Sequence, residues 1–180
     1  MSDNYYKDII LDGICSDIKK ARDNTILAGS VILTLSAIDA MSFLAMPLGQ
    51  KKVHRRDYVN WVEKYMKTDP KQPYQYKGID LYGARCGIVH RYGVKSRLSE
   101  KGQCKIFAYH NGSEHIYNPK VDGNFVLISI RRFTNDFFDA VEEFLQDMII
   151  DKNVKSRVDS RILGLFRVAK NKNNIYNLKS

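Results

Sequence analysis

The sequence predicts a mainly α-helical fold that carries a small antiparallel β insertion. Apolar residues recur at every third or fourth position over most of the chain, which is the spacing of a helix with one buried face. Between residues 104 and 131 the pattern changes to alternation, which is typical of strands. A length of 180 residues suits one domain with a real core. We therefore expect a single domain over residues 1–170, with the insertion at about 103–131 and a flexible tail over 171–180.

The first two predicted helices cover residues 5–22 and about 26–46. Four isoleucines between positions 9 and 18 lie at helical spacing in the first helix. The second helix is the most apolar stretch of the chain and stops at Pro47, because proline cannot continue a helix. Asp39 and several hydroxyl groups interrupt it, so we interpret it as a buried helix and not as a membrane span.

Four more helices are expected further along the chain, two on each side of the insertion. Residues 57–67 have apolar groups at helical spacing, and a loop with two prolines separates them from a helix over 78–93. After the insertion, a stripe of phenylalanine and aliphatic residues predicts a helix over 133–150. A final helix over 154–169 is basic on one face.

The insertion is predicted to hold three strands, over residues 104–110, 115–118 and 124–131. The first two flank a connection that contains Asn-Gly, which is a hairpin signal. His110 and His115 would face each other across this turn, with a cysteine on the same hairpin. This spacing matches no known zinc signature, so neither a metal nor another cofactor is expected.

The charge balance favours a polyanionic partner. Lysine and arginine number 29 and aspartate and glutamate 20, which gives a net charge of +9. Nucleic acid is the first partner to expect, and an anionic membrane surface the second. The three cysteines are widely spaced and form no disulfide framework, which suits a reducing cytoplasm. The N-terminus also lacks the pattern of a signal peptide.

Arg85 and His90 stand out because they lie in a helical run of apolar and small residues. On an ideal helix their side chains are separated by about 140°, so we expect them to converge poorly on one phosphate within one chain. His90 shares its side of the helix with Gly83 and Gly87, and glycines four apart allow a second backbone to approach closely. That backbone belongs either to a second copy of the chain or to another part of the same chain.

Asp39 is the predicted partner of Arg85. Each is a charged group on the apolar side of its helix, and a charge in that position is costly without a partner. We therefore expect the two side chains to meet. The pair has either a purely structural role or a role in orienting the site.

The segment Arg85-Cys-Gly-Ile-Val-His90 follows Leu-Tyr near a helix end and resembles the R-x4–6-H motif of HEPN domains. The preceding helix pair, with an acidic residue in the apolar run SAIDAMSFL, is also similar to that family. The resemblance covers about the first ninety residues and the helix after the insertion. It implies a HEPN-like helical bundle. Many HEPN domains are metal-independent ribonucleases of toxin–antitoxin, abortive-infection and CRISPR-associated systems.

The resemblance implies an endoribonuclease that acts as a toxin or as a phage-defence effector. The 2′-hydroxyl of RNA attacks the adjacent phosphorus, His90 handles the protons and Arg85 stabilises the added negative charge. Two copies of the chain share one cleft across a two-fold axis, and Asp39 orients the site. The implied partners are RNA, a second copy and an antitoxin protein. His54, His110 and His115 are expected to be dispensable.

Two alternatives remain at this point. Cys86 follows Arg85 directly, where many active HEPN members carry a polar residue, and this favours a non-catalytic HEPN-like module for RNA binding or dimerisation. Without the resemblance, the chain is a basic helical interaction protein. If the chain binds nucleic acid, the cations of the basic connection over residues 49–56 and those just after the motif are candidates for contacts to phosphates. They are Lys51, Lys52, Arg55, Arg56, Arg91, Lys95 and Arg97. The basic connection is equally consistent with a solvated loop.

Overall fold

The computed structural model describes residues 4–166 of the chain, and over this range the fold is mainly helical, as predicted. The tail expected over 171–180 and the last residues of the helix expected over 154–169 lie outside the described residues. The helices that form the body of the fold are α3 (Leu27–Ala45), α4 (Arg55–Tyr65), α5 (Gly78–Arg91) and α7 (Ile130–Ile150). They agree with the predicted helices to within a few residues at each end.

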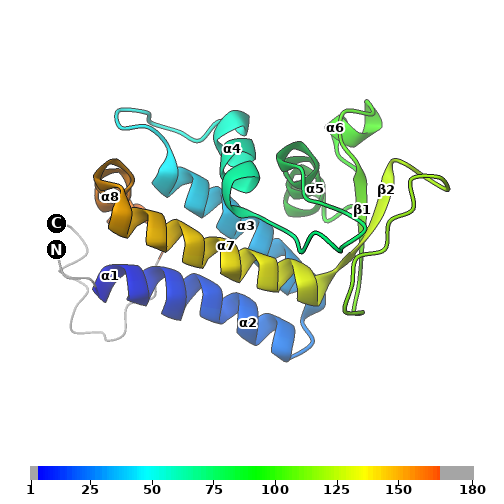
Figure 1. The fold of residues 1–180 in the computed structure, drawn as a ribbon, viewed down its shortest axis with the longest axis horizontal. Helices are drawn as coiled ribbons and strands as arrows, with labels where there is room; N and C mark the ends of the chain where they lie inside the picture. Colours follow the sequence, from blue (N-terminus) through cyan, green and yellow to red (C-terminus); the bar gives the residue numbers. More distant parts are fainter. Residues whose placement is uncertain (1–3, 167–180) are drawn as a thin grey trace.

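The first predicted helix is continuous but not uniform. It begins as α1 (Asn4–Tyr6), widens into a π-helical stretch (Lys7–Cys15) and ends as α2 (Ser16–Asp23). This helix and α7 run side by side along the length of the molecule, while α4 and α5 cross the long helices on one side (Figure 1). The arrangement is a helical bundle with α3 at its centre.

The core lies where α3, α4 and α7 meet. The stripe predicted on α7 is buried, and Phe137 and Phe144 pack around Trp61 of α4. Leu35 and Ile38 of α3 are also fully buried. By length and composition α3 is the one helix among the described residues that suits a membrane span, but half of its apolar window is buried inside the fold. Its burial is that of a core helix.

The predicted β insertion is wrong in its topology. The structure contains two strands, β1 (Ile106–His110) and β2 (Phe125–Ser129), and they pair in parallel. The expected middle strand is reduced to one antiparallel bridge between Ile116 and Leu127. The segment does not fold back as a hairpin, and the backbone N–H of His115 donates to the side chain of Gln72 (3.0 Å) and not to β1.

The His115 side chain is fully buried and holds the sheet against the helices. Its Nδ1 accepts a hydrogen bond from the backbone N–H of Ser129 (3.1 Å), so the ring proton belongs on Nε2, which lies 2.8 Å from the hydroxyl of Tyr76. That hydroxyl donates to Asp136 (3.0 Å), whose other oxygen lies 3.1 Å from Arg132 Nε. His115 is therefore a structural residue. The expectation that it is dispensable concerns cleavage and not the stability of the fold.

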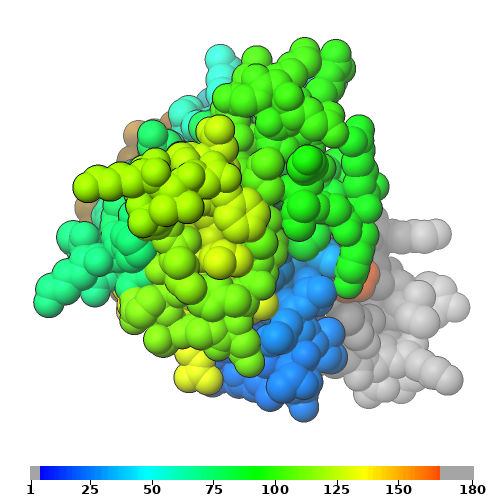
Figure 2. Space-filling model, turned by 90° about the vertical axis from the view of Figure 1, so that its right-hand side faces the viewer, coloured from blue at the N-terminus to red at the C-terminus, as the bar shows by residue number. Residues whose placement is uncertain are grey.

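The face of α5 that carries Gly83 and Gly87 is covered by the same chain. A methyl group on Gly83 would collide with the sulfur of Cys104, and one on Gly87 would lie 2.8 Å from the carbonyl oxygen of Gly93. The segment after α5, which includes the short helix α6 (Arg97–Glu100), lies beside the sheet at one end of the molecule (Figure 2). Gly83 therefore admits the side chain of Cys104 and Gly87 admits the backbone after α5, so the chain itself covers this face and a second copy does not.

The last helix is shorter than predicted. α8 (Lys152–Asp159) ends early and is followed by one 3-10 turn (Ile162–Gly164). Arg161 donates hydrogen bonds to the carbonyl oxygens of Met46 (2.8 Å) and Pro47 (2.6 Å).

Arg157 of α8 also donates to the carbonyl oxygen of Ala45, the last residue of α3, at 3.4 Å. Because the last carbonyls of a helix lack partners within it, these arginines satisfy carbonyl groups at and just beyond the end of α3. Arg157 and Arg161 thus pack within the chain, whereas Lys152 of α8 is exposed.

The buried network predicts a dependence of stability on pH. Burial, followed by the charge of Arg132, lowers the pKa of His115 from 6.5 to about 4. The unfolded chain therefore binds a proton on this histidine before the folded protein does, and the folded protein loses stability as the pH falls from 6.5 to about 4. Burial raises the pKa of Asp136 from 3.8 to about 6. The folded protein therefore binds a proton on this carboxylate before the unfolded chain does, and through this group the folded protein gains stability as the pH falls from about 6 to 3.8. In Asp136→Asn only the first contribution remains. The free energy of unfolding should then fall more steeply below pH 6.5 than in the wild type, by up to about 1.4 kcal/mol per pH unit. Urea titrations across this range test this, and parallel curves for the two proteins would contradict it.

The packing of Gly83 predicts a reversal of an ordinary helix preference. Alanine normally favours a helix over glycine by about 1 kcal/mol, but the clash with Cys104 should make Gly83→Ala destabilising by about 1–3 kcal/mol. The same substitution in a Cys104→Ala background should cost less, because the sulfur is gone. Thermal or urea unfolding of the four proteins measures the difference. Equal costs in both backgrounds would place the close contact elsewhere.

Candidate active site

Asp39, Arg85 and His90 form one connected chain of polar side chains. Arg85 Nε donates to Asp39 Oδ2 at 2.6 Å, and Arg85 Nη1 lies 2.7 Å from His90 Nε2. The predicted contact between Asp39 and Arg85 is confirmed. Within one chain the long arginine side chain spans the angle between the two positions on the helix and reaches His90. The expectation that the pair converges poorly on one phosphate stays a prediction.

The hydrogen bonds determine which nitrogen of His90 carries the proton. Arginine is only a donor, so Nε2 of His90 must accept, and the proton of the neutral ring lies on Nδ1. The single lone pair of Nε2 therefore points at the Arg85 guanidinium, and His90 is exposed to solvent. When Nη1 of Arg85 turns from the histidine to a bound phosphate, Nε2 becomes able to take a proton from the substrate.

The ion pair is partly shielded from water. The side chain of Asp39 is 28% exposed and that of Arg85 is 22% exposed. Burial raises the pKa of the Asp39 carboxyl, and the hydrogen bond and charge of Arg85 oppose this rise. Burial is the largest single influence on the pKa of Arg85 and lowers it, but the hydrogen bond and charge of Asp39, together with smaller contributions from Cys86, outweigh burial and raise the pKa of the guanidinium. Arg85 is therefore a fixed positive charge at the surface of the protein.

A groove with a volume of about 480 Å³ opens beside the ion pair, between α3, α5 and the start of α4. The Arg55 guanidinium lies over the Tyr82 ring, 5.6 Å from its centroid, so a second cation stands on the groove wall. The lining residues are Asp39, Ala40, Phe43, Val53, His54, Arg55, Tyr82 and Arg85. The groove combines two arginines, one carboxylate and two aromatic rings.

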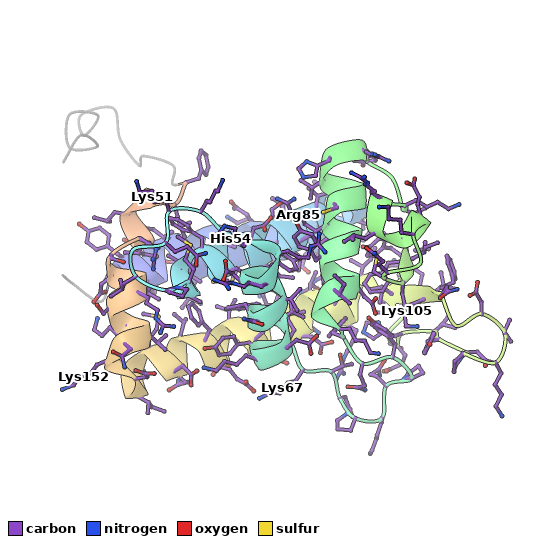
Figure 3. The ribbon with its side chains drawn as sticks, turned by 90° about the horizontal axis from the view of Figure 1, so that it is seen from above. Lys51, His54, Lys67, Arg85, Lys105 and Lys152 are labelled. Atoms are coloured by element: carbon purple, nitrogen blue, oxygen red, sulfur yellow. The ribbon has the colours of Figure 1, made fainter. Side chains whose placement is uncertain are left out.

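Of the residues predicted to contact phosphates, only Arg55 lines the groove. Lys51 and His54 lie on the same side of the molecule as Arg85, along the edge formed by α3, whereas Lys67 and Lys152 lie toward α7 (Figure 3). Lys51, Lys52, Arg91, Lys95 and Arg97 are exposed, and Arg91 Nη1 lies 3.7 Å from Glu100. Arg56 is not part of the groove, since it lines a separate cavity of about 360 Å³ between α3, α4, α7 and α8.

Sequence reasoning missed the walls of the groove. Phe43 lies four residues after Asp39 on α3, and Tyr82 lies three residues before Arg85 on α5. Both spacings place a side chain on the same helix face as the charged residue, so the pattern carried the signal. His54 also lines the groove, and the expectation that it is dispensable for cleavage stays a prediction. His54 lies in the loop between α3 and α4, and periodic sequence patterns do not predict the path of such a loop.

The histidines of the β region form no second site. His115 is bound within the core, and His110 Nδ1 accepts a hydrogen bond from the backbone N–H of Gly112 (3.1 Å). Among residues 4–166 no group of three histidine, cysteine, aspartate or glutamate side chains is arranged to hold a metal ion. The polar chemistry therefore concentrates at the groove.

No known protein family matches the sequence, and comparisons with curated proteins and with solved structures find no similar protein. The resemblance to HEPN domains stays a hypothesis. What the site can do has to be argued from its own geometry.

The ion pair predicts a coupled loss of stability. Because Asp39 and Arg85 are partly exposed, replacing either with alanine should lower the free energy of unfolding by about 1–3 kcal/mol, less than the loss of about 3–5 kcal/mol expected in a fully buried pair. In the double variant the two losses should not add, because the second substitution removes the charge that the first left unpaired. Urea unfolding of all four proteins measures this. Additive losses would show that the pair does not interact in solution.

Proposed function

We propose that this protein is a metal-independent endoribonuclease of the HEPN type, acting in the cytoplasm as a toxin or phage-defence effector. One observation carries the proposal: an arginine that lines a groove and is fixed by a carboxylate is hydrogen-bonded to an exposed histidine. Arginine matches phosphate oxygens with a fork of donors, and histidine is the side chain best suited to proton transfer near neutral pH.

The reaction uses the 2′-hydroxyl of RNA as its nucleophile. Nη1 of Arg85 exchanges its contact with His90 for a phosphoryl oxygen of the bound RNA, and the freed Nε2 takes the proton from the 2′-oxygen while that oxygen forms a bond to the adjacent phosphorus. The bond from phosphorus to the 5′-oxygen breaks, and that oxygen gains a proton from water. Arg85 stabilises the extra negative charge on the phosphoryl oxygens, and Asp39 holds the guanidinium in place. The products are a 2′,3′-cyclic phosphate and a 5′-hydroxyl.

The contact between Arg85 and His90 within one chain also changes what a dimer would contribute. A second copy is not required to bring these two groups together. The homodimer implied by the HEPN resemblance stays a prediction, and its interface cannot use the Gly83 and Gly87 face, which the chain itself covers. An antitoxin partner likewise stays a prediction.

Purified protein should cleave single-stranded RNA in the presence of EDTA and leave cyclic-phosphate ends. His90→Ala should lower the rate by about 10²–10⁴-fold through loss of the proton carrier, and Arg85→Ala by about 10²–10³-fold through loss of charge stabilisation. Labelled RNA resolved on gels, with end-group analysis by mass spectrometry, gives both the rate and the chemistry.

Two matched controls accompany this experiment. His110→Ala removes a histidine outside the groove and should leave cleavage unchanged. Arg55→Ala should raise KM, whereas Arg56→Ala removes the neighbouring cation, which faces the other cavity, and should do so less. Full cleavage by His90→Ala would refute the assigned site. Tight RNA binding without any cleavage would instead support the non-catalytic binding module.

A further inference from the structure

The carboxylate of Asp39 uses only one of its two oxygens to hold Arg85. Oδ2 accepts the hydrogen bond from Arg85 Nε, and no hydrogen bond within residues 4–166 engages Oδ1. The side chain is 28% exposed and lines the groove. An ionised carboxylate only accepts hydrogen bonds, so the free oxygen is suited to a donor on a molecule bound in the groove.

The walls of the groove fit a flat, partly apolar group with polar edges. Phe43 and Tyr82 are half-buried aromatic residues, and Arg55 stands over the Tyr82 ring. A volume of about 480 Å³ lies within the range of pockets that hold small ligands. Nucleobases stack on aromatic and arginine side chains, and a neighbouring phosphate would meet Arg55 or Arg85.

We infer that the groove binds the nucleobase next to the cleaved phosphate, and that Asp39 selects a base with an exocyclic amino group over uracil. This inference rests on the proposed function. Adenine, cytosine and guanine each offer an amino donor to the free carboxylate oxygen. Uracil offers only its ring N3–H, and the two carbonyl oxygens that flank this group repel a carboxylate. Asp39 thus has two roles, since it positions Arg85 with one oxygen and reads the base with the other.

The inference predicts different effects on base preference for Asp39→Asn and for Asp39→Ala. The asparagine side chain still accepts from Arg85 Nε through its oxygen, but it turns an NH₂ donor toward the groove in place of an acceptor. That donor suits the carbonyl oxygens of uracil. Asp39→Asn should therefore change the preference among bases, whereas Asp39→Ala should slow cleavage of every substrate and reduce the preference.

The test uses DNA oligonucleotides that contain one ribonucleotide, because the single 2′-hydroxyl confines cleavage to one bond. The base is varied first at the ribonucleotide and then at the nucleotide that follows it. With the wild-type protein, uracil at one of these two positions should lower kcat/KM by about tenfold, which is the scale of one hydrogen bond to a charged group. Asp39→Asn should abolish or reverse this ratio, and circular dichroism checks that the variant is folded.

Three outcomes would overturn the inference. Equal cleavage with all four bases at both positions would show that the groove does not read the base. An equal loss for all bases in Asp39→Asn, with the ratio unchanged, would leave Asp39 as a positioning residue only. Neither result would affect the proposed ribonuclease activity. If the protein cleaves neither these oligonucleotides nor all-RNA substrates, the proposed activity is refuted, and the inference with it.

Discussion

The ion pair between Asp39 and Arg85 joins the most buried helix of the fold to the helix that carries the candidate catalytic residues. It holds a guanidinium at the surface of the protein, where the charge is only partly solvated, and in the orientation that reaches His90. Without a partner, an arginine would either turn to solvent or carry a large desolvation cost. The shape of the groove, the orientation of Arg85 toward His90 and the packing of α5 on α3 all depend on this contact.

The helices and the ion pair were predictable because their signals are local or paired. Stripes such as Phe137 and Phe144 identify a buried helix face, and two charges on apolar faces identify each other. The strand pairing was not predictable in this way. An Asn-Gly turn favours a hairpin, but the buried contacts of His115 with Tyr76 and Ser129 compete with it. Such contacts form between distant segments and leave no periodic pattern.

The candidate site shows a second limit of sequence reasoning. An ideal helix places Arg85 and His90 far apart in angle, but side chains of different length do not project equally from the axis. A long arginine that is anchored at one end by Asp39 lies along the helix surface and meets the histidine. The two glycines four residues apart correctly predicted a close approach to this face of α5. They did not predict which group approaches, and at Gly83 it is the sulfur of Cys104.

The parallel pairing of β1 and β2 has a consequence for the order of folding. Parallel strands cannot pair until the chain between them, residues 111–124, has crossed over, and closing such a loop costs entropy before any strand contact offsets it. β2 also runs directly into α7 without a loop. The sheet should therefore form late, after α7 has docked on α3. The groove, built from α3, α4, α5 and the loop before α4, is then assembled before the end of the molecule that carries the sheet.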